Sequence, residues 1–279
     1  MLDIVIHVLA AAVYLGLAWH FWNTRWRRRT PTTRLRPWER GAILVALGIH
    51  GALLYSQIFA AAELRFGFAQ ALSVMTWLAV LICWVEGIFF RIELVYPMAL
   101  AAAALCAPLP AFFSGRTSPD PVSFEFRLHL FFGMLAYSLF VVATFHALLI
   151  SSVERRLHAA HGTAQSGSWL EGPLRDVPPL LSLERLVFRL IGAAFAVLTV
   201  TFVVGIAYSE SFLGRAMRFD HKTLFVALSW LVFALLLAGR WLYGWRGRTA
   251  LRWTLTGFIM LMLAYPGSRF VLEVILHRG

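Results

Sequence analysis

The sequence predicts an all-α integral membrane protein, a bundle of about eight transmembrane helices with no substantial soluble domain. Apolar residues make up 60% of the 279 residues and charged residues only 14%, whereas a soluble domain of this length carries about 25% charged residues. The apolar residues also occur in runs of about 20, the length that crosses a bilayer. We therefore expect a single polytopic membrane domain over residues 1–279.

Eight apolar runs account for most of the chain, and each is long enough to cross a hydrocarbon core of ~30 Å. The third and fourth runs are separated only by Phe90–Ile92, which predicts a tight helical hairpin. The longest connection, about 153–184, is rich in Gly, Ser, Pro and His and is expected to be a linker. The expected spans cover residues 2–22, 41–61, 70–89, 93–113, 128–152, 185–208, 222–244 and 253–276.

The positive charge of the chain lies mainly in alternate loops. The net charge is +11, but the basic residues sit in short loops between apolar runs, where they orient helices and form no nucleic-acid surface. Odd-numbered loops hold most of them, which places these loops in the cytoplasm and both termini in the periplasm. Because every basic residue except Lys222 is Arg, a bias typical of GC-rich genomes, we expect a bacterial inner (plasma) membrane. The first loop alone holds Arg25, Arg27, Arg28, Arg29, Arg34, Arg36 and Arg40.

The sequence contains none of the common hydrolase or nucleotide-binding motifs. It has no GxSxG, phosphate-loop or HExxH pattern, and Cys83 and Cys106 form no CxxC or CxxCH motif. The two cysteines fall in separate expected spans, which argues against a disulfide. No inverted repeat is evident, so a small-molecule transporter is the weaker alternative. We expect a protein that is not an enzyme.

Histidines are the most informative polar residues in the expected spans, because neutral imidazole ligates haem iron and transition metals. His129 lies at the outer start of the fifth span and His221 at the outer start of the seventh. Two histidines from different helices at one membrane face could hold an iron from both sides. The alternative is a pair of interfacial histidines that make ordinary hydrogen bonds in loops.

A second pair of histidines lies deeper in the expected spans. His50 is about nine residues from the cytoplasmic end of the second span and His146 about six from that of the fifth, so their depths differ by ~5 Å. They could form a second site, or each could make an interhelical hydrogen bond. His129 and His146 are ~25 Å apart along one helix and cannot share one metal.

Two ionisable side chains stand near the outer end of the last span. Arg269 and Glu273 are four residues apart on one helical face, which favours an i,i+4 ion pair. The alternative is that Arg269 binds an anion such as a haem propionate, because a guanidinium donates two parallel hydrogen bonds to a carboxylate. Glu86, late in the third span, is expected to pair with a base such as Arg91. The arginines that could join Arg269 at an anion are Arg127, Arg215 and Arg218.

The C-terminal half contains five segments that carry a family resemblance. They are Pro178–Glu184 (PPLLSLE), Asp220–Thr223 (DHKT), Ala238–Arg240 (AGR), Gly244–Arg248 (GWRGR) and Ala264–Glu273 (AYPGSRFVLE). Their order and spacing resembles the cytochrome c assembly protein family, haem-handling membrane proteins related to CcsA and CcmC. The short HemX/YpjD-like branch is the most similar. The resemblance covers essentially the whole chain and is most specific over about 126–275.

The resemblance implies haem ligation by particular residues. By position, His129 and His221 match two external histidines that flank a tryptophan-rich WWD segment in larger members and bind haem outside the membrane. His50 resembles the transmembrane histidine of an inner haem site in CcsA-type members, and His146 is a weaker match. The loop at about Ser209–Asp220 contains no tryptophan and no WWD motif. Haem ligation is therefore expected to survive, but cytochrome c synthetase activity is not.

These observations predict an inner-membrane haem-binding or haem-handling protein in cytochrome c assembly or haem homeostasis. It would hold haem b non-covalently through two histidines near the periplasmic face, while arginines neutralise the propionates. Expected partners are the lipid bilayer and other cytochrome-assembly or haem-synthesis proteins, without nucleic acid. The main alternative is a regulatory or scaffold protein that binds no haem, as in HemX-like control of tetrapyrrole synthesis.

Overall fold

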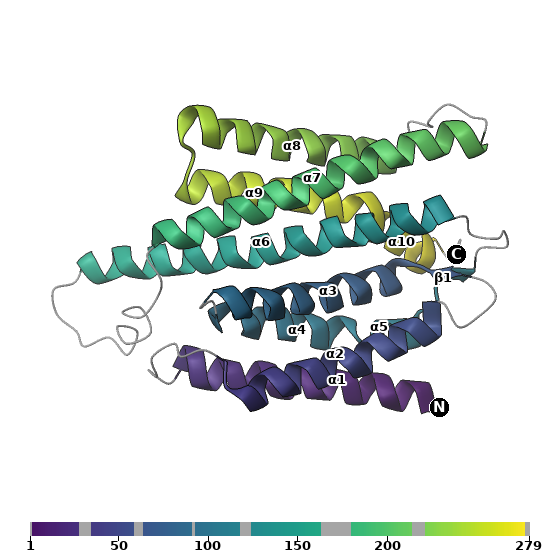
Figure 1. Ribbon diagram of the computed structural model, residues 1–279, viewed down its shortest axis with the longest axis horizontal. Helices are drawn as coiled ribbons and strands as arrows, with labels where there is room; N and C mark the ends of the chain where they lie inside the picture. Colours follow the sequence, from purple (N-terminus) through teal and green to yellow (C-terminus); the bar gives the residue numbers. More distant parts are fainter. Residues whose placement is uncertain are drawn as a thin grey trace.

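The structure is a computed structural model that describes residues 2–27, 35–58, 64–90, 93–117, 124–162, 180–213 and 221–276. Within these residues, eight helices are long and apolar enough to cross a membrane, and they run side by side along one axis (Figure 1). The expected all-α membrane bundle is confirmed. The side chains of 2–3, 116–117, 156–162, 180–181 and 207–213 lie outside the described part.

Four of the spans form the N-terminal half of the bundle. α1 (Leu2–Phe21) continues as a π-helical turn, η1 (Trp22–Arg27), and is followed by α2 (Pro37–Ile58) and α3 (Phe68–Phe89). The fourth span begins with the 3-10 turn η2 (Glu93–Val95), becomes α4 (Tyr96–Cys106), and ends in α5 (Leu109–Phe112). The short step from α3 to η2 confirms the expected tight hairpin.

The C-terminal half contains the other four spans. It consists of α6 (Phe124–Gly162), α7 (Leu180–Leu213), α8 (His221–Tyr243) and a last span that begins with α9 (Gly247–Met262). Pro266 lies inside this last span, where it has no N–H for the helical ladder, and the helix widens there into π-helical turns. The span continues through η3 (Leu263–Gly267), α10 (Ser268–Phe270) and η4 (Val271–Ile275).

The expected linker at 153–184 is shorter than the sequence analysis predicts. α6 continues through Gly162 and α7 begins at Leu180, so both helices extend beyond the apolar runs. The extension of α6 carries Glu, Arg, Leu and Ala, which are strong helix formers and need no apolar environment to be helical.

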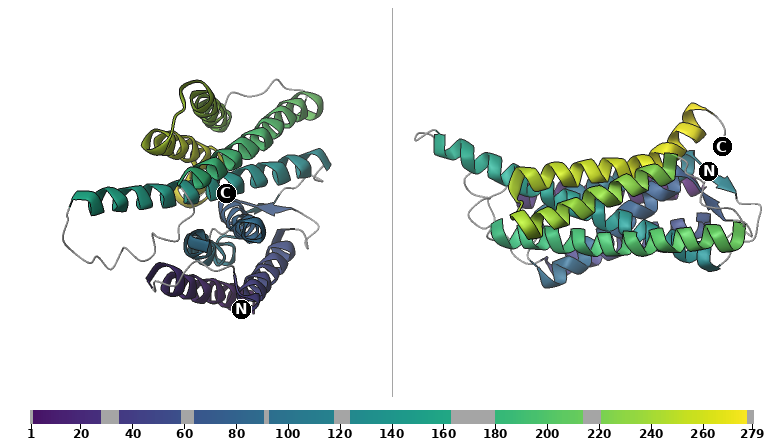
Figure 2. Two further views of the ribbon diagram at one scale, coloured as in Figure 1. Left: turned by 60° about the vertical axis from the view of Figure 1, so that its left-hand side comes forward. Right: turned by 90° about the horizontal axis from the view of Figure 1, so that it is seen from above.

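α6 is the central helix of the bundle. In Figures 1 and 2 it lies between the N-terminal helices on one side and α7, α8 and α9 on the other. In its most apolar stretch 78% of the residues are buried, against 22% in α8. The Phe140 ring of α6 stacks on Phe233 of α8 with the ring centroids 3.9 Å apart. Side chains of α6 can therefore contact helices of both halves of the bundle.

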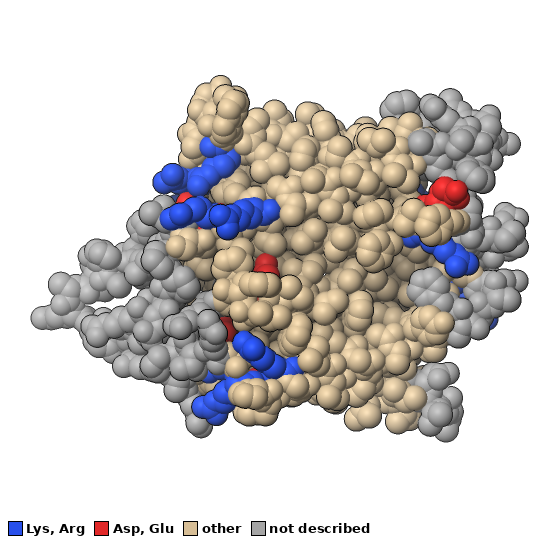
Figure 3. Space-filling model, viewed as in Figure 1, with Lys and Arg blue, Asp and Glu red and all other residues tan. Residues whose placement is uncertain are grey.

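Both ends of the chain lie at the same end of the bundle (Figure 1), which we call the terminal end. β1 (Arg65–Phe66) and β2 (Arg116–Thr117) pair there as a short antiparallel ladder, with Arg65 opposite Thr117. The end of α6, the start of α7 and the connection from α8 to α9 lie at the opposite end. On the face seen in Figure 3, charged side chains gather toward the two ends, and the band between them is almost entirely uncharged. Such a band is what a hydrocarbon core requires.

Candidate functional site

His129 lies near the start of α6 at the terminal end, where its ring faces α7. Its Nδ1 is 3.1 Å from the backbone carbonyl oxygen of Thr201. A carbonyl oxygen can only accept, so Nδ1 carries the hydrogen and donates it. In the neutral ring Nε2 then holds the lone pair that a metal uses. A ring nitrogen bonded to a backbone carbonyl is the usual support of a metal-ligating histidine.

Arg269 lies at about the same depth as His129. The Tyr137 hydroxyl of α6 donates to the Leu261 carbonyl of α9 at 2.9 Å, which fixes the alignment of these helices. His129 and Arg269 each lie eight positions beyond this contact toward the terminal end, ~12 Å along the helices. Arg127, two positions before His129, is exposed.

His221 is the first residue of α8 and is exposed. The Trp230 indole of α8 donates to the Thr199 hydroxyl at 2.9 Å, which aligns α8 with α7. By residue count His221 lies ~10 Å closer to the terminal end than Thr201, the partner of His129. The two histidines thus share one end of the bundle, but the structure records no direct contact between them. Arg215 and Arg218 lie outside the described residues.

The expected ion pair between Arg269 and Glu273 does not form. Glu273 Oε2 accepts from the backbone N–H of Phe68 at 3.4 Å, which places the carboxylate at the start of α3. Negative charge is favourable there, because the first N–H groups of a helix are unpaired. The guanidinium of Arg269 lies 5.7 Å from the centre of the Tyr265 ring, and its Nε is buried without a hydrogen bond. The π-helical turns Leu263–Gly267 and Val271–Ile275 explain the failure, because they disturb the i,i+4 alignment of an α-helix.

His50 is part of a buried hydrogen-bond network in the N-terminal half. It is fully buried, with Nδ1 3.3 Å from the Tyr14 hydroxyl and Nε2 2.8 Å from the Ser73 hydroxyl. His7 is used in the same way, by the Ala107 carbonyl at Nδ1 and the Gln57 amide at Nε2. Both ring nitrogens of each histidine are therefore engaged in packing α1 to α4 together.

His146 pairs with a carboxylate and lies far from His50. Its Nδ1 donates to the Val142 carbonyl at 2.9 Å, and its Nε2 faces Glu86 Oε2 at 3.6 Å. Arg91, the expected partner of Glu86, lies outside the described residues. The partners of His50 and His146 on α3, Ser73 and Glu86, are thirteen residues apart, ~20 Å along the helix. The structure does not bring the two histidines together.

A cluster of buried charges at the opposite end escaped the sequence analysis. Arg25 Nη2 is 3.0 Å from Glu39 Oε2, and Arg25 Nε is 2.9 Å from Glu93 Oε2. His20 Nε2 adds a contact of 2.9 Å to Glu39 Oε1. The side chains of Arg25, Glu39 and Glu93 are only 1–3% exposed. The sequence contains a signal for this cluster, because carboxylates at the start of two apolar runs need partners, but an arginine in an arginine-rich loop by itself indicates only orientation in the membrane.

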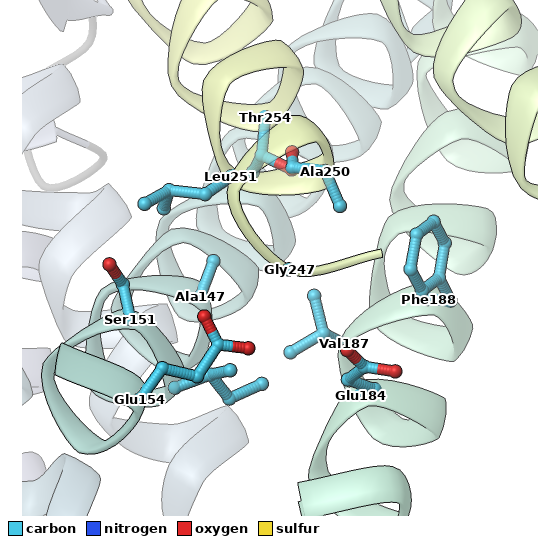
Figure 4. Close-up of a pocket in the computed structure, with 11 residues that line it drawn as sticks. Ala147, Ser151, Glu154, Glu184, Val187, Phe188, Gly247, Ala250, Leu251 and Thr254 are labelled. Atoms are coloured by element: carbon cyan, nitrogen blue, oxygen red, sulfur yellow. The ribbon is translucent and has the colours of Figure 1, made fainter. Parts of the chain in front are cut away.

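A recess opens between α6, α7 and α9 (Figure 4). Glu154 and Glu184 give it two carboxylates, and Val187, Phe188 and Leu251 give it an apolar wall. The Glu154 carboxylate lies against Gly247 at the start of α9, where negative charge is favourable. Ser151, on the α6 wall, is 22 positions from His129, ~33 Å along the helix. The recess is therefore separate from the histidine site.

The residues at the terminal end fit a haem better than a bare metal ion. Among the described residues, no three His, Cys, Asp or Glu side chains converge to hold a metal. A haem needs only one or two axial nitrogens, since its own ring supplies four, together with cations for its carboxylates. His129 offers such a nitrogen, and Arg269 offers a guanidinium without a carboxylate partner in the described structure.

Comparisons with known proteins agree with the resemblance. The cytochrome c assembly protein family matches residues 41–276. The inner membrane protein YpjD of Escherichia coli is 25% identical over 248 residues, which cover 85% of this chain and 89% of that protein. A 28.8 kDa protein of Azospirillum brasilense is 34% identical over 53% of this chain and 52% of its own length.

The match to larger proteins is partial. The cytochrome c biogenesis protein CcsA of Gloeobacter violaceus is 29% identical over 92 residues, 33% of this chain and 27% of that protein. No solved structure matches the chain. The family match spans far more than half of the residues and includes seven of the eight spans in full or in large part. The chain therefore belongs to the cytochrome c assembly protein family.

Proposed function

We propose that this protein binds haem b non-covalently at the terminal end of its bundle and acts in cytochrome c assembly or haem homeostasis. The observation that carries the proposal is the hydrogen bond from His129 Nδ1 to the Thr201 carbonyl, which leaves Nε2 as a ligand nitrogen. Bound haem would supply redox chemistry at its iron. The residues of the chain would hold it, orient it and set its access to water.

Arginines at the terminal end would neutralise the propionates. Arg269 supports this role because Glu273 contacts Phe68 instead of Arg269, so the guanidinium keeps its capacity for a bidentate carboxylate contact. Arg127 is exposed near His129. Arg215 and Arg218 remain part of the proposal by their place in the sequence, between α7 and α8.

His221 is the second axial ligand in this proposal, because it is exposed at the same end of the bundle and matches the family's second flanking histidine. His146 ranks behind this pair, since Glu86 faces the nitrogen that would bind iron. His50 ranks last, because Tyr14 and Ser73 would both have to release its ring.

The family and the relatives named CcsA support a role in cytochrome c assembly. We propose a non-enzymatic role, because the connection between α7 and α8 contains no tryptophan on which a haem could be presented to an apocytochrome. Partners would be other cytochrome-assembly or haem-synthesis proteins in the same inner membrane, and both termini would face the periplasm.

An absorption spectrum of the detergent-purified protein, before and after addition of haemin, tests the proposal. Saturable binding of one haem with a Soret band of a six-coordinate, low-spin iron is the expected result. A protein that never develops a Soret band would contradict haem binding and favour a regulatory or scaffold role without haem.

A further inference from the structure

The Thr201 carbonyl, which accepts the hydrogen bond from His129, belongs to a helical turn that a side chain four positions further on would normally cover. In α7 the Thr201 carbonyl accepts the N–H of Gly205, as each helical carbonyl does from the residue four positions on. It has a second lone pair, but side chains in a helix lean back toward the N-terminus. A side chain at position 205 would therefore lie over the turn that contains Thr201. Because residue 205 is glycine, that carbonyl is open to α6.

The space above Gly205 is filled by the His129 ring. A Cβ atom on Gly205 would lie 2.9 Å from Cε1 and 3.3 Å from Nδ1 of His129. Carbon atoms in contact are about 3.5–4.0 Å apart, so any side chain there would displace the ring. The ring is rigid and is held in place at Nδ1, so the displacement would break the bond to Thr201.

Of the two glycines of α7, only Gly205 is approached this closely. At Gly192, on the same helix, nothing lies within 4 Å of a Cβ position. At Gly133, one turn beyond His129 on α6, the nearest atom is the Thr201 methyl carbon at an ordinary 3.6 Å. Thr201 thus packs its methyl group on Gly133 while its carbonyl accepts from His129. Together these contacts fix the alignment of α6 and α7 at the ring.

We propose that Gly205 and the Thr201 carbonyl are a positioning site for His129, which selects the ring tautomer and aims Nε2 at the iron of a metallated porphyrin. This inference rests on the proposed function for the identity of the ligand. The positioning itself is a property of the protein without ligand. An unprotonated Nε2 binds a metal centre but has no hydrogen to offer an anion or a metal-free ring.

The first test compares Gly205→Ala with Gly192→Ala, a matched control on the same helix. Gly205→Ala should weaken haemin binding roughly 10- to 100-fold, as loss of the support of a ligating histidine does, and should shift the Soret band from the low-spin form. Gly192→Ala should bind as the wild type does. Binding of metal-free protoporphyrin IX should not distinguish the three proteins. A Gly205→Ala protein with wild-type haemin affinity and spectrum would overturn the positioning role.

The second test needs no haem. Gly205→Ala should lower the melting temperature in detergent by roughly 3–8 °C when His129 is present, because the new methyl group collides with the ring. In a His129→Ala background the same change should have no such cost, since the ring is gone. An equal fall in melting temperature in both backgrounds would show that Gly205 does not position the His129 ring. If the wild type binds no haem but this coupling is found, the proposed function fails while the positioning site stands.

Discussion

Glu86 of α3 and His146 of α6 face each other across the two halves of the bundle, with Oε2 of the carboxyl 3.6 Å from Nε2 of the ring. Their side chains are 11% and 1% exposed. Replacing either residue by Leu removes this contact between two largely buried polar groups, which should lower the free energy of unfolding by about 1–3 kcal/mol. The double replacement should cost less than the sum of the two single ones. Thermal unfolding in detergent measures this coupling, and strictly additive losses would show that the pair is not energetically linked.

Arg25 should matter far more to stability than its neighbour Arg27. Arg25 is buried between Glu39 and Glu93, so Arg25→Met removes the cation that both buried carboxylates contact and should cost about 3 kcal/mol or more. Arg27 is exposed on the same turn, and Arg27→Met should change stability by less than about 0.5 kcal/mol. Equal melting temperatures for the two variants would contradict the buried cluster.

Arg269 and Glu273 should act independently of one another. Glu273→Leu removes the carboxylate at the start of α3 and should cost about 1 kcal/mol. Arg269→Met should lower haem affinity with little further loss of stability. In a double-mutant cycle of melting temperatures the two effects should add within about 0.5 kcal/mol. Strong coupling between the two substitutions would show that Arg269 and Glu273 do form the ion pair that the sequence alone favours.

Replacement of the proposed iron ligands should change the haem spectrum in a defined way. His129→Ala and His221→Ala should each give a five-coordinate or haem-depleted protein, and the double variant should lose the site. His158→Ala and His161→Ala are controls, because these residues lie on α6 at least ~40 Å from His129. A full, unshifted Soret band in the double variant would show that the ligands are assigned wrongly.

His50→Ala tests for a second haem site. Because both ring nitrogens of His50 are hydrogen-bonded to Tyr14 and Ser73, the variant should keep its haem content. It should lose about 1–3 kcal/mol of stability through the polar groups left unpaired. Loss of part of the haem would instead reveal an inner site that uses His50.

Reporter fusions test the orientation in the membrane. The eight spans of the described residues leave both termini at one end of the bundle, and the arginine-rich loops are expected in the cytoplasm, so alkaline phosphatase fused after Gly279 should be active. A cytoplasmic reporter fused at the same point should be inactive. The reverse pattern would invert the topology.

The helical spans were predictable because membrane insertion depends on the length and hydropathy of local segments. The eight expected ranges agree with the helices of the structure to within a few residues at most of their ends. The error at 153–184 arose because helix does not stop where hydropathy does. α6 continues to Gly162 on residues with high helix propensity but low hydropathy.

Side-chain partners across helices were not predictable, because they depend on how each helix is rotated and aligned with its neighbours. Spacing along one helix favoured an ion pair between Arg269 and Glu273. In the structure the last span contains π-helical turns and α3 lies close to it, so Glu273 accepts a hydrogen bond from the Phe68 N–H instead. Nothing in the sequence pointed to the contact between Glu86 and His146, which the packing of α3 on α6 brings about.

The sequence by itself determined that this protein crosses a membrane, where its helices lie and which histidines reach the terminal end, since hydropathy and residue count carry that information. Only the tertiary structure decided which ring nitrogens are in use. His50 has none to spare, while His129 keeps Nε2 because Gly205 leaves the Thr201 carbonyl open. That difference depends on contacts between helices that are far apart in the sequence, and these contacts form only when the bundle packs.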